Sequence, residues 1–442
     1  MEMKKSMAAI FAGACAALVL SGCASAELAH RYPAMAALQI EGARLIEPER
    51  GAQDGEAVAA ARGANDFAFR LGAALLQDAG HENFVVSPYS VWLPLAALLN
   101  ATREQYRPAL LQALGAQGIH AGDINRAASR MLFDLTNEMA RRQGWGDGFE
   151  ENPLLIANAI FVDGRLTPRT EFAQIFADFF RGELMSVDFR SPDAVAAVNQ
   201  WASDNTNGLI SQVVQEFDPL TVAAIANAIY FADAWRNEFD PGRTERDVFF
   251  SPAGESFAYF MQLERNDFSY FEDEHVQAVD LPFATGGGMT IILPRNADAA
   301  GFLSAMSSES FERMQGGFSV ARGRLLLPRF SIENTIGNLS SALVALGVPL
   351  FDEASAPLTG GLIEENIPVW LTDAVQVAMI EVDEEGTTAA AVTVMMAGTT
   401  AFVPPPPEVF EMVCNSPFAF VLHRPTHDGG RQVVFTGVVN RP

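Results

Sequence analysis

Apolar residues that recur every three to four positions predict helices, most of them in the first half of the chain. A cap at Asn65-Asp66 opens the first helix, and Gly80 ends it. A second helix begins at Ser87-Pro88, where serine is the capping residue and proline is the first helical residue. The predicted helices span residues 65–80, 87–100, 103–115, 122–143, 168–180, 191–204 and 339–347.

Near-continuous apolar runs predict buried strands. The two longest runs, 155–162 and 222–231, both contain Ala-Asn-Ala-Ile, which predicts two central strands of one sheet with a buried asparagine in each. Shorter strands, separated by Gly and Pro, are predicted at 83–86, 281–283, 289–294, 325–332, 418–423 and 432–439. No linker divides residues 61–442, so the sequence predicts one α+β domain.

The N-terminus has the pattern of a processing signal. Two lysines precede an apolar run from Met7 to Leu20, which is too short to be a mature membrane span. Leu20-Ser21-Gly22-Cys23 follows and resembles a bacterial lipobox, whose cysteine becomes lipidated; cleavage after Ala24 or Ala26 is the alternative. We therefore expect a lipoprotein signal peptide at 1–22, a lipidated flexible tether at 23–60 and the domain at 61–442. The domain would be exported and lipid-anchored in the bacterial cell envelope, on either the periplasmic or the surface side, or secreted if the lipobox is not used.

Charge and cysteine content exclude several function classes. The formal net charge of −25 argues against a nucleic-acid partner, because phosphate binding needs clustered Lys and Arg. It also argues against attraction to an anionic membrane, so the only expected membrane contact is lipid on Cys23. If the signal is removed, Cys414 is the one thiol left without lipid, and no intramolecular disulfide is possible. The six histidines are scattered, which gives no metal site.

Residues 382–403 have an unusual pattern for either a loop or a core strand. Every residue from Thr387 to Val394 is small or β-branched, and none is charged. Threonine and valine favour a strand, while the three alanines offer little for a permanent partner to pack against. Such a segment suits a strand that slides into a close-packed interior. An Ala/Thr-rich linker is the alternative interpretation, and the Pro404–Pro407 run that follows predicts a stiff polyproline spacer.

This segment resembles the hinge of the reactive-centre loop in inhibitory serpins, here of a bacterial lipoprotein type. The family's loop is bait for a protease, and after cleavage its first arm enters a β-sheet as a new strand. The resemblance implies a mixed three-sheet core with about eight to nine helices, and an exposed loop at about 384–407. The matching hinge residues are Glu384, Glu385, Gly386, Thr387, Thr388, Ala389, Ala390, Ala391, Val392 and Thr393.

Further segments carry the resemblance from about residue 64 to the C-terminus. They include Leu327-Pro328-Arg329-Phe330 and, near the end, Asn415 to Phe420. By position, a polar shutter network beneath the opening of the central sheet would consist of Ser87, Ser90, Asn227 and Gln376. The family usually has a histidine where this chain has Gln376. Glutamine donates and accepts hydrogen bonds as neutral histidine does but carries no pH switch, so pH-gated behaviour is in doubt.

The resemblance also implies a target and a mechanism. Counting from Glu384 places the scissile bond at Thr400–Ala401, where a small residue favours elastase-like serine proteases. The segment after Ala401 is longer than usual, and a shifted register at Phe402, Met395 or Met396 would favour chymotrypsin-like proteases. Inserted from Thr387 to Thr400, the strand would span about 46 Å at ~3.3 Å per residue. In the family this movement drags the acylated protease across the inhibitor and distorts its active site.

No catalytic constellation accompanies these features, so we expect a monomeric protease inhibitor rather than an enzyme, without a cofactor. Ser87 precedes a proline and has no His or Asp motif beside it, and His427-Asp428 falls in a predicted turn. Arginines such as Arg126 and Arg130 alternate with acidic residues, which argues against a glycosaminoglycan cofactor. The alternative functions are a non-inhibitory serpin and a surface lipoprotein with a binding or structural role.

Overall fold

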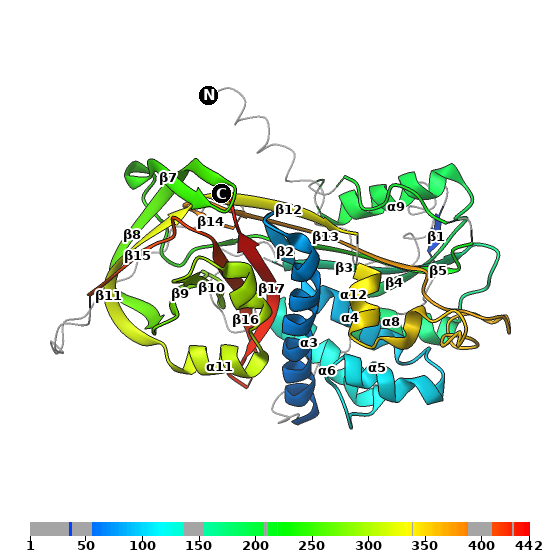
Figure 1. Ribbon diagram of the computed structural model, residues 1–442. Coiled ribbons are helices and arrows are strands. Elements are labelled where there is room, and N and C mark those ends of the chain that lie inside the picture. The colour runs from blue at the N-terminus through cyan, green and yellow to red at the C-terminus, as the bar shows by residue number, and fades with distance from the viewer. Residues whose placement is uncertain are drawn as a thin grey trace, which may run out of the picture.

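The computed structural model describes residues 35–37, 55–136, 154–206, 208, 211–218, 220–337, 339–387, 409–426 and 428–442. Two large β-sheets and surrounding helices form the described part of the chain (Figure 1). The nine α-helices of this part are α3 (Gly55–Ala79), α4 (Pro88–Leu98), α5 (Arg107–Ala113), α6 (Ala121–Leu135), α8 (Thr170–Phe180), α9 (Pro192–Asn205), α10 (Ala299–Ser304), α11 (Ser308–Gly316) and α12 (Leu339–Ala345).

Sheet A has eight strands and both parallel and antiparallel pairs. Its order is β1-β4-β3-β5-β13-β14-β6, with β12 paired to β13 on a side branch. Helix α9 lies on one face, while α4, α8 and α12 lie on the other (Figure 1). The strands are β1 (Met35–Ala37), β3 (Leu154–Asp163), β4 (Gly182–Val187), β5 (Ala223–Phe231), β6 (Asp233–Ala234), β12 (Phe330–Ile336), β13 (Asp373–Val382) and β14 (Gly386–Thr387).

Sheet B has nine strands in the order β15-β11-β8-β9-β10-β16-β17-β2, with β7 paired to β8. The last hairpin, β16 and β17, lies against β2 and the long helix α3, and forms much of the core. The strands are β2 (Phe84–Val86), β7 (Glu245–Ser251), β8 (Gly254–Glu272), β9 (Val276–Pro282), β10 (Gly288–Pro294), β11 (Ser319–Pro328), β15 (Val409–Val413), β16 (Phe418–Pro425) and β17 (Arg431–Val439).

The α+β fold predicted from the sequence is confirmed, and so is the expected number of helices among the described residues. Strands β3 and β5 are central neighbours in sheet A, as the two Ala-Asn-Ala-Ile runs predicted. The third sheet is not separate in the described residues. Strand β8 is 19 residues long and pairs with β7 at its start, with β11 from Phe260 to Tyr270 and with β9 at its end, which joins what would be two sheets.

Three local predictions differ from the structure. Helix α3 begins at Gly55, not Asn65, and crosses the boundary expected at residue 60. Its first turns bury small side chains, and a Cβ on Gly63 would lie 2.3 Å from the Gly115 carbonyl oxygen, so only small residues fit this contact. The single strand predicted at 325–332 is two strands in different sheets, β11 and β12, which meet at Arg329. Ser87 holds the cap position of α4, but its side chain makes no cap hydrogen bond.

Candidate functional site

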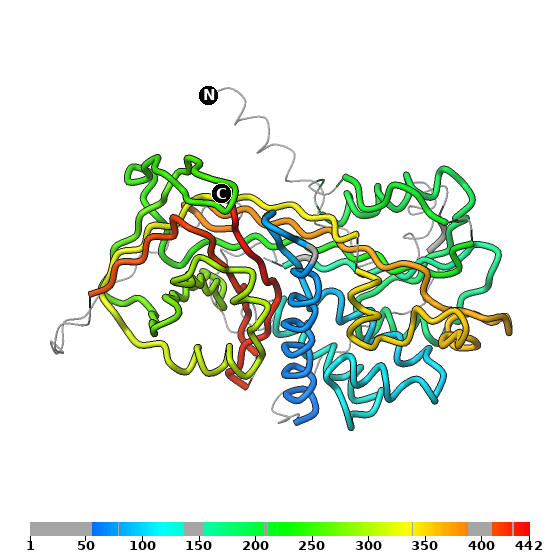
Figure 2. The backbone as a smooth tube through the Cα atoms, in the orientation of Figure 1, coloured from blue at the N-terminus to red at the C-terminus, as the bar shows by residue number. Residues whose placement is uncertain are grey.

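Strands β5 and β13 form a parallel seam in the middle of sheet A. They are about 150 residues apart in sequence yet run side by side (Figure 2), with register pairs from Asp373–Ala224 to Ala378–Ile229. Parallel pairing is slightly weaker per residue than antiparallel pairing. A strand entering between β5 and β13 would be antiparallel to both, so the seam is a place where sheet A can gain a strand.

Beyond the Ala378–Ile229 end of the seam, the sheet already contains a short piece of such a strand. Gly386 and Thr387 form β14, which pairs antiparallel with β13 on one side and with β6 on the other. We call this two-residue position the slot. Thr387 is fully buried there, and its hydroxyl lies 3.2 Å from the Asp233 amide nitrogen and 3.3 Å from the Asp233 carbonyl oxygen. The chain therefore enters sheet A at Gly386 and Thr387.

A tight turn leads the chain from β13 into the slot. The Asp383 carboxylate accepts hydrogen bonds from the amides of Glu385 (2.9 Å) and Gly386 (3.1 Å). A Cβ on Gly386 would lie 2.2 Å from the Asp233 carbonyl oxygen, so glycine is required by close backbone approach at this point.

The Glu384 side chain fastens this turn to the start of β12. Arg329 donates to both carboxylate oxygens, with distances of 2.6–2.9 Å, and the Thr244 hydroxyl donates to the same carboxylate. Burial alone would raise the pKa of Glu384, but the hydrogen bonds from Arg329 and Thr244 outweigh it and hold the pKa below its usual value. The hinge is thus anchored by a bidentate salt bridge between Arg329 and Glu384.

The four polar residues predicted for the shutter network lie together at mid-seam, fully or almost fully buried. The Gln376 carbonyl accepts from the Ser87 amide (2.9 Å). Its amide nitrogen lies 2.8 Å from the Ser87 carbonyl, 2.8 Å from the Ser90 hydroxyl and 3.3 Å from the Asn227 carbonyl oxygen. Asn227 in turn donates to Asn158 (2.6 Å), which extends the network to β3.

This arrangement gives each network residue a hydrogen-bonding role. The Ser87 hydroxyl donates to the Val434 carbonyl (2.8 Å), which ties the start of α4 to sheet B. Because Ser87 is fully buried and has no histidine among its hydrogen-bond partners in the described structure, it is not set up as a nucleophile. The network joins β13, β5, β3 and α4 at the point where the two seam strands meet.

A buried ion pair beside the slot was not predicted from the sequence. Arg424 of β16 donates to Asp233 at 3.1 Å, and both side chains are almost fully buried. Burial outweighs their attraction: it raises the pKa of Asp233 to about 6 and lowers the pKa of Arg424. Each charged residue ends or follows an apolar run, which indicates that it could be buried. A single sequence does not show that two residues 191 positions apart are in contact.

Several predicted site residues fall outside the described residues. They are Cys23, Thr388, Ala389, Ala390, Ala391, Val392, Thr393, Met395, Met396, Thr400, Ala401 and Phe402. The hinge residues Glu384, Glu385, Gly386 and Thr387 and the four shutter residues are described and occupy the positions given above. Their part in strand insertion stays a prediction.

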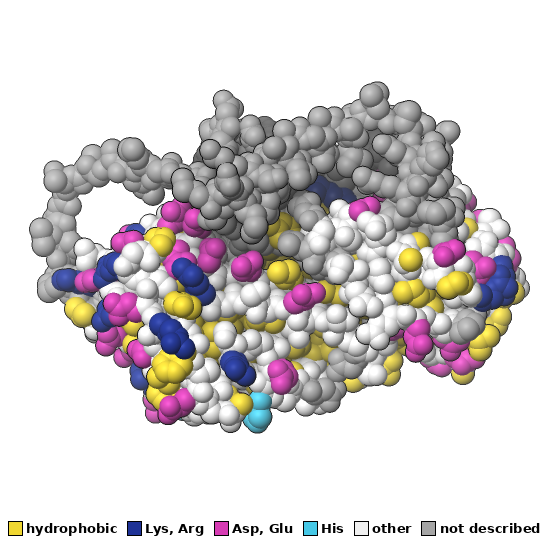
Figure 3. All heavy atoms as spheres, turned by 90° about the horizontal axis from the view of Figure 1, so that it is seen from above, with side chains coloured by type: hydrophobic (Ala, Val, Ile, Leu, Met, Phe, Trp, Pro, Cys, Tyr) yellow, Lys and Arg dark blue, Asp and Glu magenta, His cyan; other side chains and the backbone are white. Residues whose placement is uncertain are grey.

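Other chemistry is sparse in the described ranges. They hold no group of three His, Cys, Asp or Glu side chains suited to a metal ion. None of the helices in these ranges is long and apolar enough to cross a membrane. Cys414 is buried, and burial raises the pKa of its thiol, which makes the thiolate form scarce. The described surface visible in Figure 3 carries acidic and basic side chains intermixed.

Comparison with known proteins gives one consistent family. The model of the family described as Serpin (serine protease inhibitor) matches residues 62–442. Serpin-Z4 of Hordeum vulgare is 30% identical over 394 residues, covering 85% of this chain and 94% of the relative. The native crystal structure of the thermophilic serpin tengpin covers 90% of this chain and 96% of its own, at 23% identity and a TM-score of 0.75. Human thyroxine-binding globulin in complex with thyroxine covers 88% and 99%, at 22% identity and a TM-score of 0.74. This chain therefore shares its fold with both structures.

Proposed function

The chain belongs to the serpin family, and on that basis we propose that it is a suicide-type inhibitor of serine proteases. The protease would cleave the segment after the slot, and the freed arm would insert between β5 and β13 while the acylated protease is still attached. The observation that carries this proposal is the slot itself. Two hinge residues already form a strand of sheet A that is paired on both sides, and β5 and β13 pair directly with each other along the rest of the seam.

The register of the slot supports continued insertion. Thr387 faces Val382 on β13 and Asp233 on β6. If the same antiparallel ladder continued six residues further, Thr393 would lie opposite the residues six positions back on each side, which are Gln376 and Asn227. These two residues are themselves register partners across the closed seam. Both neighbouring strands therefore lead to the same position for the incoming chain.

Thr393 is chemically suited to that position. Its hydroxyl can both donate and accept, so it can replace the contact between Gln376 and Asn227 that the incoming strand would separate. Small side chains elsewhere from Thr387 to Val394 would limit steric clashes with the closely packed faces of sheet A. A ten-residue strand would add roughly ten ladder hydrogen bonds net, each contributing about 0.5–1.5 kcal/mol. Insertion would thus be favourable by several kcal/mol.

The finer assignments rest on the sequence. We place the scissile bond at Thr400–Ala401 and expect elastase-like or, with a shifted register, chymotrypsin-like targets. We also propose that the protein acts as a monomer, is not an enzyme and is held at the bacterial cell envelope by lipid on Cys23. The hinge supports inhibition because it contains no proline, charge or bulky group from Thr387 to Val394.

A non-inhibitory role is the second candidate. It is favoured by the likeness in fold to thyroxine-binding globulin, whose crystal structure contains bound thyroxine. In that case the loop would be cleaved by a protease without trapping it.

The two candidates separate in one experiment. Protein starting after Cys23 is incubated with pancreatic elastase, chymotrypsin, trypsin and subtilisin, and the products are run on a denaturing gel. We expect a complex that survives denaturation, together with a released C-terminal peptide whose mass gives the scissile bond. Cleavage without a complex, and without a rise in thermal stability, would support the non-inhibitory role instead.

A further inference from the structure

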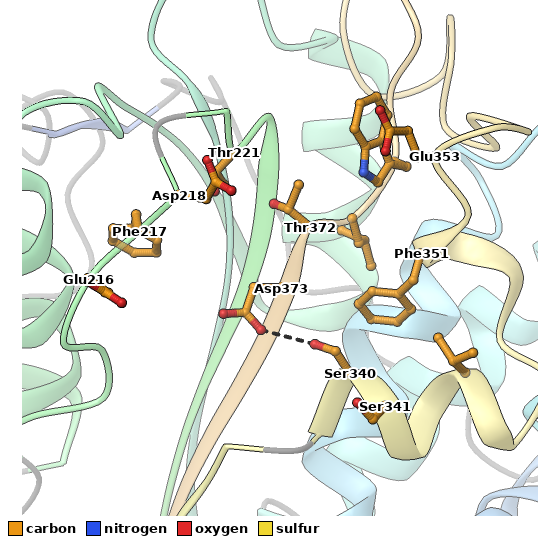
Figure 4. A pocket seen from close by; sticks show the side chains of 13 residues that line it. Glu216, Phe217, Asp218, Thr221, Ser340, Ser341, Phe351, Glu353, Thr372 and Asp373 are labelled. Atoms are coloured by element: carbon orange, nitrogen blue, oxygen red, sulfur yellow. Dashed lines mark hydrogen bonds between the residues drawn. The ribbon is translucent and has the colours of Figure 1, made fainter.

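A cavity of about 530 Å³ lies at the Asp373–Ala224 end of the seam, which is the end far from the slot. One wall is formed by Glu216, Phe217, Asp218 and Thr221, from the segment that leads into β5. The other wall is formed by the start of β13 and by α12 (Figure 4). The two walls meet where Thr372 bonds to the Ala223 carbonyl through both its amide (3.1 Å) and its hydroxyl (2.9 Å). The cavity therefore spans both strands of the seam.

The lining combines aromatic rings with charge of one sign. Phe217, Phe351 and Trp370 supply partly buried aromatic surface. The charged side chains among the described lining residues are all carboxylates. They are Glu216, Asp218, Glu353 and Asp373. Aromatic faces and carboxylates both attract a cation, and the rings also accept an apolar body.

One hydroxyl at this cavity has an open hydrogen-bonding position. Thr221 is only 2% exposed and lines the cavity. Its backbone amide donates to the Asp218 carbonyl (2.8 Å), whereas its hydroxyl makes no hydrogen bond within the described part of the chain. The hydroxyl of Thr372, on the other wall, is by contrast bonded to Ala223. The hydroxyl borders the cavity, where a ligand would provide a hydrogen-bond partner.

We propose that this cavity binds a small organic amine, with its ammonium group between the carboxylates and its apolar body against the aromatic rings. Asp218 and Glu353 lie on different walls (Figure 4), so a ligand that meets both connects the two sides of the seam. The Thr221 hydroxyl accepts a hydrogen bond from the ammonium group. Asp373 is partly engaged already, because it accepts from the Ser340 hydroxyl (3.0 Å), and it adds charge rather than a free ligand atom.

Binding at this place would regulate the proposed inhibitor, a consequence that rests on the proposed function. Nine residues beyond Thr387, the extended register brings the incoming strand to Asp373 and Ala224, at the cavity. A strand there moves the walls apart by about one strand spacing, roughly 4.8 Å. A ligand that needs both walls therefore binds the closed seam better than the open one and opposes insertion to the same degree.

The test uses phenethylamine as the probe and 3-phenylpropionate, an anion of similar size, as its control. Isothermal titration calorimetry with the intact chain at 0.15 M salt should give saturable binding of phenethylamine with a Kd of about a millimolar, as its small size allows. The anion should not bind. The absence of saturable binding up to tenfold above that concentration, or equal binding of the anion, would overturn the proposal.

Matched variants locate the site. Asp218→Asn with Glu353→Gln should weaken phenethylamine binding by about tenfold, and Thr221→Val by about fivefold. Asparagine at 218 keeps the acceptor for the Leu220 amide, so the loop retains its shape. The control is Glu312→Gln on α11, an exposed acidic residue away from the cavity, which should leave the affinity unchanged. Equal affinity in all variants would contradict the assignment to this cavity.

The regulatory part has a separate readout. Chain cleaved in the loop should bind phenethylamine at least tenfold more weakly than intact chain, because the walls have separated. If cleaved and intact chain bind equally and the charge-selective binding remains, the ligand site stands and strand insertion fails. If neither intact nor cleaved chain binds phenethylamine, the proposed ligand site is wrong, whether or not the loop inserts.

Discussion

The Gln376 side chain should hold the closed seam together, and replacing it with leucine tests this. Leucine has a similar volume but neither donates nor accepts hydrogen bonds. In the described structure, Gln376→Leu would leave the Ser87 amide without its acceptor and the Asn227 carbonyl oxygen without its donor. Each orphaned buried group costs about 1–3 kcal/mol, so the free energy of unfolding should fall by about 2–6 kcal/mol.

Urea unfolding followed by far-UV circular dichroism measures this loss. At an m-value of about 3 kcal/mol/M, a loss near 4 kcal/mol lowers the unfolding midpoint by roughly 1 M. Gln112→Leu, at an exposed position on α5, is the control and should leave the midpoint nearly unchanged. A midpoint shift of the Gln376→Leu variant below about 0.3 M would refute the reasoning, since the network would then contribute almost nothing.

A histidine at the same position should add pH dependence. Gln376→His keeps one donor and one acceptor, so it should cost less than leucine at pH 8. Burial lowers the pKa of a histidine below its unfolded value near 6.5, so the unfolded chain binds the proton more readily. Stability of this variant should therefore fall as the pH drops below about 6.5, beyond any change in the parent protein. Identical pH profiles for variant and parent would contradict burial of this side chain in the closed state.

Three further predictions concern the slot. Thr387→Arg should leave loop cleavage intact but abolish the denaturant-resistant protease complex, because a buried, unpaired guanidinium costs several kcal/mol; an undiminished yield of complex on a gel would contradict this. Arg329→Met should lower the free energy of unfolding by about 2 kcal/mol, since Glu384 keeps only the Thr244 hydroxyl, and urea unfolding against the parent protein checks it. Burial raises the pKa of Asp233 to about 6, above its unfolded value, so its ionisation destabilises the fold as the pH rises from about 4 to 6. Over that range the parent should lose about 3 kcal/mol relative to Asp233→Asn, and parallel pH profiles would show that Asp233 is not buried as described.

Much of the site could be predicted from the sequence because the relevant residues occur in local patterns. Asn227 lies within an apolar run, and Gln376 lies between valines, so both could be expected inside the sheet. The resemblance to the family then assigned them to one network with Ser87 and Ser90. The start of α3 was missed for the opposite reason. Its first turns are alanine and glycine with few large apolar residues, which is typical of a tether, and their close packing becomes visible only against Gly115.

Long-range charge pairing could not be read from the sequence. Arg329 stood in a recognised segment, but its partner Glu384 is 55 positions away, and nothing local indicates the contact. The split of 325–332 into β11 and β12 has the same origin. The run is continuously strand-like, and the change of sheet depends on what lies beside each half.

The central claim is that β5 and β13 must part for the loop to enter, and a disulfide across the seam tests it most directly. Ala226 and Val375 are register partners on these strands, so cysteines at both positions can bridge. The double variant starts after Cys23 and is incubated with the susceptible protease, once oxidised and once after reduction. The account predicts loop cleavage without a trapped complex in the oxidised protein, and full trapping after reduction. A complex formed equally well with the disulfide closed would contradict the account.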